Sequence, residues 1–360
     1  MALSPPQHVI IVGAGALGML TALELHRRGL RVSLVEKGRA GRESSWAGGG
    51  ILSPILPWNY PEPIWRLSRR SLDLYQALGI ELAGRTGVDP ELSASGAISL
   101  DPQPRAQAFA WCERERLEAR PWRGPLYIGG PEQSGVALPW IGHVRNPRLC
   151  RALRSHLLQL GVELLEHCAV TGWYMKAGRV VGVRTADGER RADAVVLAAG
   201  AWSAQLEASL PVAPVRGQML LLACEPGRLA SIVFRDGRYL IPRRDGRILV
   251  GSTVEHGGFD TAVSAQAREE LLGFAVEVLG REVAGKVEHH WAGLRPGTRD
   301  ELPYIGEHPD LPGLFLNTGH YRNGLIMGPA SAELLADLML GRPTRIDAAP
   351  YRAERARRRA

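Results

Sequence analysis

A glycine motif near the N-terminus constrains the fold of this chain more than any other feature. The apolar run His8–Val12 leads into Gly13-Ala-Gly15-Ala-Leu-Gly18, and residues 19–28 then carry apolar side chains at helical spacing. A second apolar strand is predicted over residues 31–36. Strand, glycine turn, helix and strand in this order are typical of a dinucleotide-binding unit. The sequence therefore predicts an α/β protein with a Rossmann-like domain at its start.

Each glycine of the motif has a physical role in holding a dinucleotide. Gly13 permits the tight turn, Gly15 lets the backbone approach a pyrophosphate, and Gly18 lets the helix and the strand lie close together. The phosphates would then lie at the positive N-terminal end of the helix. Glu36 ends the second strand, where its carboxylate can accept hydrogen bonds from both ribose hydroxyls and would repel a 2′-phosphate. The motif predicts nucleotide binding and disfavours NADP, but it does not decide between NAD and FAD.

Length and charge indicate a globular protein of enzyme size. With 360 residues, of which 45% are hydrophobic, the chain can form two domains, or one domain with an inserted lobe, and is not intrinsically disordered. The formal net charge is +7, but the last nine residues hold five arginines and one glutamate, which is +4 of that total. We therefore expect a solvated basic tail over residues 342–360 and no nucleic-acid partner, with contact to an anionic lipid or RNA as the alternative.

The cysteines and the apolar segments exclude several further classes of protein. Cys112, Cys150, Cys168 and Cys224 form no CxxC pair and have no histidine at metal-ligand spacing. No stretch outside the glycine motif approaches the ~20 apolar residues that a membrane span needs. We expect no metal site, no disulfide framework, no integral membrane segment and a cytoplasmic location.

Later segments of the chain extend the pattern beyond one motif. They are the glycine-rich Gly41–Ile51, the strand-like Asp193–Ser203, and the C-terminal segments Trp291–Thr298, Pro303–Gly306 and Gly319–Ile326. Together they resemble the D-amino-acid-oxidase-like FAD-dependent oxidoreductases, and within that family the glycine oxidases of the thiamine pathway. The resemblance runs from about residue 9 to residue 340. An NAD dehydrogenase would account for the first motif but not for these segments.

The resemblance implies a two-domain architecture of the GR2-type flavoproteins. A discontinuous Rossmann-like FAD-binding domain is expected over residues 1–79, 145–210 and 289–341. An antiparallel β-sheet plus helix substrate domain is expected over residues 80–144 and 211–288. The residue pattern supports the second domain, because Asp236-Gly237 and Asp245-Gly246 separate short apolar strands as hairpin turns do. We also expect a linker at residues 211–214, where two prolines exclude a helix, and a helix over residues 265–279.

Three side chains are implied to bind and orient the substrate. An arginine can hold a carboxylate through two parallel hydrogen bonds, and the family motif that includes Arg295 is implied to do so. Arg322, just before a helix predicted over residues 328–340, is implied to lie near both flavin and substrate. Tyr239 is implied to donate a hydrogen bond to the carboxylate, and strand alternation places it on one face with Ile241. The alternatives are a structural ion pair for Arg295, a helix-entry charge for Arg322 and core packing for Tyr239.

The cofactor implied by the resemblance is noncovalent FAD. No cysteine follows Cys224, and the segment Ser44–Ile51 contains no histidine, so the two common covalent attachments lack their residues. The implied cofactor-binding residues are Gly13, Gly15, Ala16, Leu17, Gly18, Glu36, Lys37, Ser44, Ser45, Gly49, Gly50, Ile51, Val170, Ala199, Gly200, His320, Tyr321, Arg322, Asn323, Gly324, Leu325 and Ile326.

The activity implied by the resemblance is oxidative deamination. Glycine and small amines such as sarcosine and D-alanine would give the imine, then the 2-oxo acid (glyoxylate from glycine), ammonia and hydrogen peroxide, with O2 as the acceptor. The family further suggests a role in thiamine thiazole biosynthesis and a homotetramer. The main alternative is a D-amino-acid dehydrogenase that passes electrons to a membrane quinone, with the basic tail and residues 58–60 touching the membrane. A regulatory subunit without chemistry is a second alternative, against which Arg295, Arg322 and Tyr239 all argue.

Overall fold

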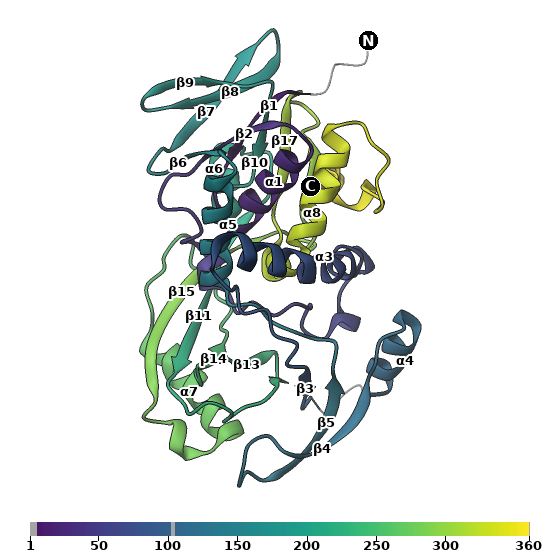
Figure 1. Ribbon diagram of the computed structural model, residues 1–360, viewed down its shortest axis with the longest axis vertical. Helices are drawn as coiled ribbons and strands as arrows, with labels where there is room; N and C mark the ends of the chain where they lie inside the picture. Colours follow the sequence, from purple (N-terminus) through teal and green to yellow (C-terminus); the bar gives the residue numbers. More distant parts are fainter. Residues whose placement is uncertain (1–5, 102–104, 360) are drawn as a thin grey trace.

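The computed structural model describes residues 6–101 and 105–359, with side chains through Ala356. Residues 1–5 at the start of the expected FAD-binding domain, residues 102–104 and the last residue of the expected basic tail lie outside this description. Figure 1 shows two large sheets in different halves of the molecule, with the long strands β11 and β15 reaching from one half toward the other. None of the helices in the described ranges combines the length and the apolar character needed to cross a bilayer.

The upper half is built around a six-stranded sheet in which β1 is central. Its strand order is β16-β17-β10-β1-β2-β6, and β1 pairs in parallel with both β2 and β10. The four residues Val9–Val12 are all buried, as expected for a parallel strand that is covered on both faces. The strands are β1 (His8–Val12), β2 (Arg31–Val35), β6 (Glu163–Leu165), β10 (Ala194–Leu197), β16 (Tyr304–Glu307) and β17 (Leu314–Thr318).

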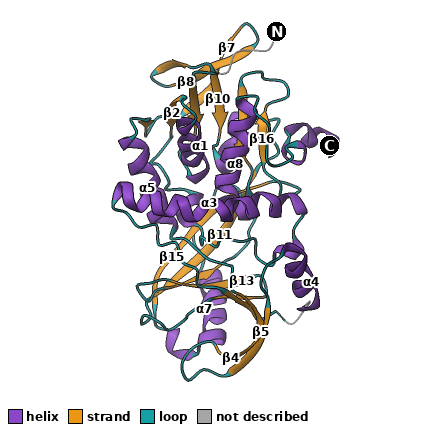
Figure 2. Cartoon of the chain, turned by 45° about the vertical axis from the view of Figure 1, so that its right-hand side comes forward, coloured by secondary structure: helices purple, strands orange, loops and turns teal. Residues whose placement is uncertain are grey.

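Helices cover this sheet and separate it from the lower half. α1 and α8 lie side by side, and α3 crosses the molecule between the two halves (Figure 2). The two helices approach closely at Gly328, where an added Cβ would lie 2.7 Å from Leu20 Cδ1. The helices of both halves, in chain order, are α1 (Ala16–Arg27), α2 (Ser44–Ala47), α3 (Glu62–Thr86), α4 (Arg105–Glu115), α5 (Asn146–Gln159), α6 (Ser203–Leu206), α7 (Ala265–Leu279) and α8 (Gly324–Met339).

The lower half is an eight-stranded mixed sheet with α7 against one face. The predicted hairpins are present: β12, β13 and β14 pair antiparallel, and Asp236-Gly237 forms a turn with positive φ at both residues. Leu271 and Phe274 of α7 pack with Leu240 and Val250 in a separate apolar core. In sheet order the strands are β15 (Val287–Gly297), β11 (Ala213–Leu222), β14 (Ile248–Gly251), β13 (Arg238–Pro242), β12 (Ile232–Arg235), β3 (Ala97–Ser99), β5 (Glu132–Leu138) and β4 (Arg120–Pro125).

A small three-stranded sheet completes the architecture at the top of Figure 1. It consists of β7 (Val170–Lys176), β8 (Arg179–Thr185) and β9 (Gly188–Arg191), all antiparallel. Val180 and Val183 of β8 pack with Val195 and Leu197 of β10, so this sheet is anchored on the parallel sheet.

The structure corrects two expected boundaries. The segment 211–214 is only partly a linker, because β11 begins at Ala213 and includes Pro214, which pairs with Pro296 near the ends of both strands. A proline is tolerated at such a strand end, where a missing N–H costs little. The last helix begins at Gly324, four residues before the predicted start, because φ and ψ at Gly324 are already helical after the short 3-10 turn Tyr321–Asn323.

The division into domains stays a proposal. The proposed boundary after residue 79 lies within α3, and the boundary after residue 288 lies within β15. Leu78 and Leu82 of α3 both belong to the core of the parallel sheet, whereas residues 213–222 and 248–251 pair in the eight-stranded sheet.

We expect Gly18→Ala to destabilise the fold. A Cβ at Gly18 would lie 1.9 Å from the carbonyl oxygen of Gly13, so backbone must move to admit it. The cost should be about 1–3 kcal/mol in the free energy of unfolding, measured by denaturant titration. Gly84→Ala is the matched control, because Gly84 is an exposed residue of α3 with no atom within 4 Å of its added Cβ. It should stabilise slightly, and equal effects of the two substitutions would contradict the prediction.

Candidate active site

A cavity of about 440 Å³ lies at the carboxyl ends of β1, β2, β10 and β17 and extends to the lower sheet. In open α/β sheets this edge is where ligands bind. The cavity brings together every predicted site residue except Gly18, which lies behind the glycine turn. From the N-terminal region these are Gly13, Gly15, Ala16, Leu17, Glu36, Lys37, Ser44, Ser45, Gly49, Gly50 and Ile51. From later in the chain these are Val170, Ala199, Gly200, Tyr239, Arg295, His320, Tyr321, Arg322, Asn323, Gly324, Leu325 and Ile326.

The glycine turn packs closely against the backbone that follows β10, so its first position excludes a side chain. Gly13 has φ +102°, and a Cβ there would lie 2.5 Å from the carbonyl oxygen of Ala198. At the start of α1 the backbone N–H of Ala16 donates to Ser45 Oγ at 2.8 Å. The helix N-terminus and a hydroxyl therefore meet at the place where the motif predicts a pyrophosphate.

Glu36 is buried and organises the turn as well as facing the cavity. Its Oε2 accepts from Ala14 N–H at 2.8 Å, and its Oε1 accepts from Gly38 N–H at 3.0 Å. A carboxylate has about four acceptor positions, so both oxygens retain capacity for further donors. Glu36 thus has a structural role that the motif alone does not indicate.

The neighbouring Lys37 lies over an aromatic ring. Its Nζ is 3.3 Å from the centroid of the Trp202 ring, whose position the sequence motifs do not single out for the site. Phe259 packs on the same indole, with ring centroids 5.7 Å apart. Burial lowers the pKa of Lys37, and the charges of Glu43 and Glu36 oppose that shift.

The segment from Ser44 to Ile51 forms the wall of the cavity between the two halves. A Cβ at Gly50 would lie 2.0 Å from the carbonyl oxygen of Val144, and a Cβ at Gly49 would lie 2.9 Å from Ile241 Cδ1. Ser44 Oγ donates to the carbonyl oxygen of Leu294, which ties the start of the segment to β15. Close backbone approach therefore requires glycine at Gly50, whereas at Gly49 an added Cβ would meet the side chains of Ile241 and Tyr239.

Buried polar atoms without partners mark the cavity as a binding site. Asn146 and Asn317 both line it, and each uses its amide nitrogen in a hydrogen bond, to Ser45 O and to Thr21 Oγ1 respectively. Their Oδ1 atoms are buried without a hydrogen-bond partner. Such acceptors normally meet a donor. Together with the glycine cradle, they fit an extended polar cofactor such as a dinucleotide.

His320 lines the cavity as a neutral side chain. Its Nε2 lies 3.0 Å from Ser331 Oγ, and it is fully enclosed. Burial, assisted by the charge of Arg355, lowers the pKa of His320 to about 3. The side chain is therefore fixed by α8 and is not poised as a base near neutral pH.

Arg295 is held in place by neutral oxygen atoms. It lies on β15 over Gly217 of β11, where an added Cβ would be 2.1 Å from Arg295 Nη1. Its Nη2 donates to Ser252 Oγ at 2.6 Å, and its Nη1 donates to the carbonyl oxygens of Arg216 and Thr253 at 3.3 and 3.2 Å. Instead of the structural ion pair considered above, the guanidinium has neutral partners, and its charge is available to an anion in the cavity.

Tyr239 and Arg322 approach the same region from different elements. Tyr239 lies opposite Gly251 in the β13–β14 pair, and a Cβ at Gly251 would be 2.5 Å from the tyrosine ring. Tyr239 and Ile241 share one apolar cluster while Leu240 belongs to another, which confirms the predicted alternation. Arg322 is exposed and donates from Nη2 to Tyr321 Oη at 3.2 Å.

Several lining residues escape the motif analysis. Tyr60, Met219 and Ser252 line the cavity together with the three predicted substrate residues. Of residues 58–60, which the quinone alternative places at a membrane, Trp58 is half-buried and packs against the Trp111 ring, with centroids 6.2 Å apart. The one signal that could have indicated Tyr60 is its position shortly after the glycine-rich segment Gly41–Ile51.

The described residues hold no group of three or more histidine, cysteine or acidic side chains that could bind a metal ion. Residues 8–338 match the family described as FAD dependent oxidoreductase. The chain belongs to this family.

Members of the family with known names are similar over nearly the full chain. A glycine oxidase from Pseudomonas aeruginosa is 48% identical over 96% of this chain and 98% of its own length. The bifunctional protein ThiO/ThiG from Synechocystis is 34% identical over 92% of this chain and 51% of its own length. The crystal structure of glycine oxidase from Geobacillus kaustophilus superposes with a TM-score of 0.88 at 31% identity, covering 98% of this chain and 99% of that one. These similarities confirm the α/β flavoprotein fold.

We expect Glu36→Gln to weaken both the fold and cofactor binding. The amide can accept from only one of the two backbone N–H groups, and its NH2 would face the other donor. Leaving a buried donor unsatisfied should cost about 1–3 kcal/mol in unfolding free energy, and FAD affinity, followed by flavin fluorescence, should fall as well. The control is Glu43→Gln, which removes an exposed carboxylate at the same cavity. Identical stability of the two variants would contradict a structural role for Glu36.

Proposed function

We propose that this chain is an FAD-dependent amino-acid oxidase that acts on glycine and small amines such as sarcosine and D-alanine. The observation that carries the proposal is Arg295, a partly buried guanidinium with neutral partners, in one cavity with the glycine cradle of an FAD-dependent family. The products are the imine, then the 2-oxo acid, ammonia and hydrogen peroxide. Glycine would yield glyoxylate.

FAD is proposed to bind without a covalent bond. Gly13, Gly15 and the N-terminus of α1 would hold the pyrophosphate, Glu36 the ribose, and Val170 the adenine. Gly49–Ile51 and the backbone of residues 320–326 would line the flavin ring. The cavity lining includes Cys168 and His320, but Cys168 lies beside Val170 at the adenine end and His320 is bonded to Ser331. When bound, FAD supplies the two-electron acceptor.

The protein's own contribution is to orient the substrate. Arg295 can present two parallel donors to the carboxylate of an amino acid, which fixes the position of its α-carbon. Tyr239 would add one neutral hydrogen bond to that carboxylate, and Arg322 would place a second positive charge near the substrate. The uncharged state of His320 agrees with a reaction that takes no proton through this side chain.

The wider context follows from the relatives. One relative is named glycine oxidase, which supports O2 as the acceptor, and another is named bifunctional protein ThiO/ThiG, which supports a role in thiamine thiazole biosynthesis. Nothing in these similarities supports the quinone-dependent alternative. Cys112, Cys150, Cys168 and Cys224 are free thiols in the structure, which supports the proposed cytoplasmic location. A homotetramer remains part of the proposal.

Purified protein should consume oxygen and release peroxide when glycine is added without another acceptor. Sarcosine and D-alanine complete the substrate panel, and acid precipitation should release free FAD from the polypeptide. If the flavin-loaded protein bleaches with amino acids but consumes no oxygen, the oxidase assignment is wrong and a dehydrogenase takes its place.

Arg295→Ala should raise KM for glycine far more than it lowers FAD content. An unpaired carboxylate in a partly desolvated pocket should cost on the order of 2–5 kcal/mol. Arg295→Lys should restore only part of the loss, because an ammonium group cannot form the two parallel bonds. Arg299→Ala, which removes an exposed arginine four residues away, is the control. Unchanged glycine kinetics in Arg295→Ala would return Arg295 to a structural role.

A further inference from the structure

Arg243 is a buried arginine that connects the lower sheet to the glycine-rich wall of the cavity. It follows the last residue of β13, and only 7% of its surface is exposed. Its Nη2 donates to the carbonyl oxygen of Gly49 at 2.8 Å. Its Nη1 donates to the carbonyl oxygen of Val144 at 3.2 Å and lies 3.0 Å from His143 Nδ1. The guanidinium therefore lies directly behind the Gly49–Gly50 peptide.

The Gly49–Gly50 segment that Arg243 contacts is also held by Val144 and packs against Tyr239. The backbone N–H of Val144 donates to the carbonyl oxygen of Gly50 at 2.8 Å. Gly49 also faces Tyr239, because a Cβ at Gly49 would lie 3.2 Å from the tyrosine ring. A displacement of Arg243 would thus act on the cavity wall and on a proposed substrate residue together.

Among the described residues the hydrogen-bond acceptors of Arg243 are neutral, while the carboxylates of Glu91 and Asp245 act on it as nearby charges. Burial, together with the positive charges of Arg243 and Arg244, lowers the pKa of His143 to about 3, so His143 is neutral and its Nδ1 accepts from the guanidinium. The two other acceptors, on Gly49 and Val144, are carbonyl oxygens. Burial lowers the pKa of Arg243 to about 10, an effect that Arg145 strengthens and Glu91 and Asp245 oppose. Arg243 is therefore still protonated near neutral pH.

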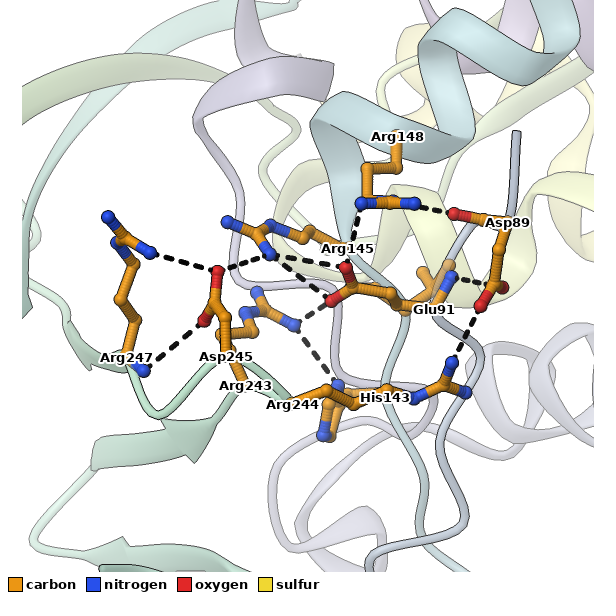
Figure 3. A network of polar contacts seen from close by, with 10 residues as sticks. Asp89, Glu91, His143, Arg145, Arg148, Arg243, Arg244, Asp245 and Arg247 are labelled. Carbon is orange, nitrogen blue, oxygen red and sulfur yellow. Dashed lines mark hydrogen bonds and ion pairs between the residues drawn. The ribbon is translucent and has the colours of Figure 1, made fainter. Parts of the chain in front are cut away.

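The surrounding ion pairs use the nearby carboxylates for other arginines (Figure 3). Glu91 pairs with Arg145 and Arg148, and Asp245 pairs with Arg145 and Arg247. The remaining pairs join Arg244 to Asp89 and Arg247 to Glu288. Four arginines thus pair with four carboxylates, and Arg243 is a fifth arginine beside them. The excess positive charge is therefore that of Arg243, whose hydrogen-bond partners are neutral and which lies behind Gly49.

We propose that Arg243 is a positioning residue that favours the reduced state of the cofactor through the Gly49–Gly50 peptide. The inference rests on the proposed function, since it takes this peptide as part of the flavin-binding wall. A fixed positive charge in a region of low dielectric stabilises negative charge that develops nearby. Its hydrogen bond also polarises the peptide that faces the cavity. Protein charges near the ring are a recognised means of tuning flavin electronics.

The test is the reduction potential of FAD in the holoenzyme, measured anaerobically together with the affinity for oxidised FAD. Arg243→Met should bind reduced FAD at least tenfold more weakly relative to oxidised FAD, which for a two-electron couple lowers the potential by about 30 mV. Arg243→Lys keeps the positive charge but loses the planar guanidinium with its several donors, so it should retain most of the wild-type potential. Arg244→Met is the matched control, because Arg244 is exposed and paired with Asp89; its potential should equal that of wild type.

A second variant tests whether the charge of Arg243 acts on the reduction potential of FAD, even if Arg243→Met fails to fold. Asp245→Asn removes a carboxylate that offsets the charge of Arg243, so its potential should move upward, opposite to that of Arg243→Met. The inference is overturned if Arg243→Met has the potential of wild type, or if Asp245→Asn lowers it. The proposed function is tested separately, because it fails if the wild-type holoenzyme consumes no oxygen with glycine. Even then, the difference in FAD reduction potential between wild type and Arg243→Met would still test the role of Arg243.

Discussion

Close approach of backbone to backbone around the cavity is the constraint on which the rest of this structure depends. At Gly13 a side chain would collide with the carbonyl oxygen of Ala198, and at Gly50 it would collide with that of Val144. These contacts fix the turn before α1 at one end and the wall between the two halves at the other. The parallel sheet and the lower sheet can therefore enclose one elongated space, in which a polar ligand can approach backbone at these glycines as well as the lining side chains.

The charges around this space follow a consistent pattern. Arg295 and Arg243 each reach the cavity or its wall from the lower sheet, and each is held by carbonyl oxygens or other neutral atoms. In contrast, the arginines further out, such as Arg145 and Arg247, are paired with carboxylates. A buried charge without a paired ion has a desolvation cost, which an anionic ligand or a negatively charged cofactor nearby can offset. The arrangement thus concentrates positive potential where an amino-acid carboxylate and a reduced flavin are proposed to lie.

Much of the site could be predicted, because its residues occur in short motifs whose local geometry is set by glycine and proline. The turn at residues 13–18, the Asp236-Gly237 hairpin and the helix Ala265–Leu279 all appear as expected. Ser252 could not be predicted, since nothing in its neighbours along the chain indicates that it faces the cavity, and Trp202 and Tyr60 lie in or near family segments that do not indicate which way their side chains point. The start of α8 at Gly324 was missed because glycine and proline at positions 324–329 argue against a helix unless packing supports it.

The sequence by itself determined the class of fold, the family and many of the residues that gather around the cavity, because these depend on local spacing and on glycine's freedom from side-chain clashes. Only the tertiary structure decided how those residues are partnered. It assigned to Glu36 two backbone donors, to Arg295 three neutral oxygens and to Arg243 a place behind Gly49. The physical reason is that most of these hydrogen bonds join residues far apart in the chain, 194 positions apart for Arg243 and Gly49 and 43 for Arg295 and Ser252, and no local pattern encodes such distances.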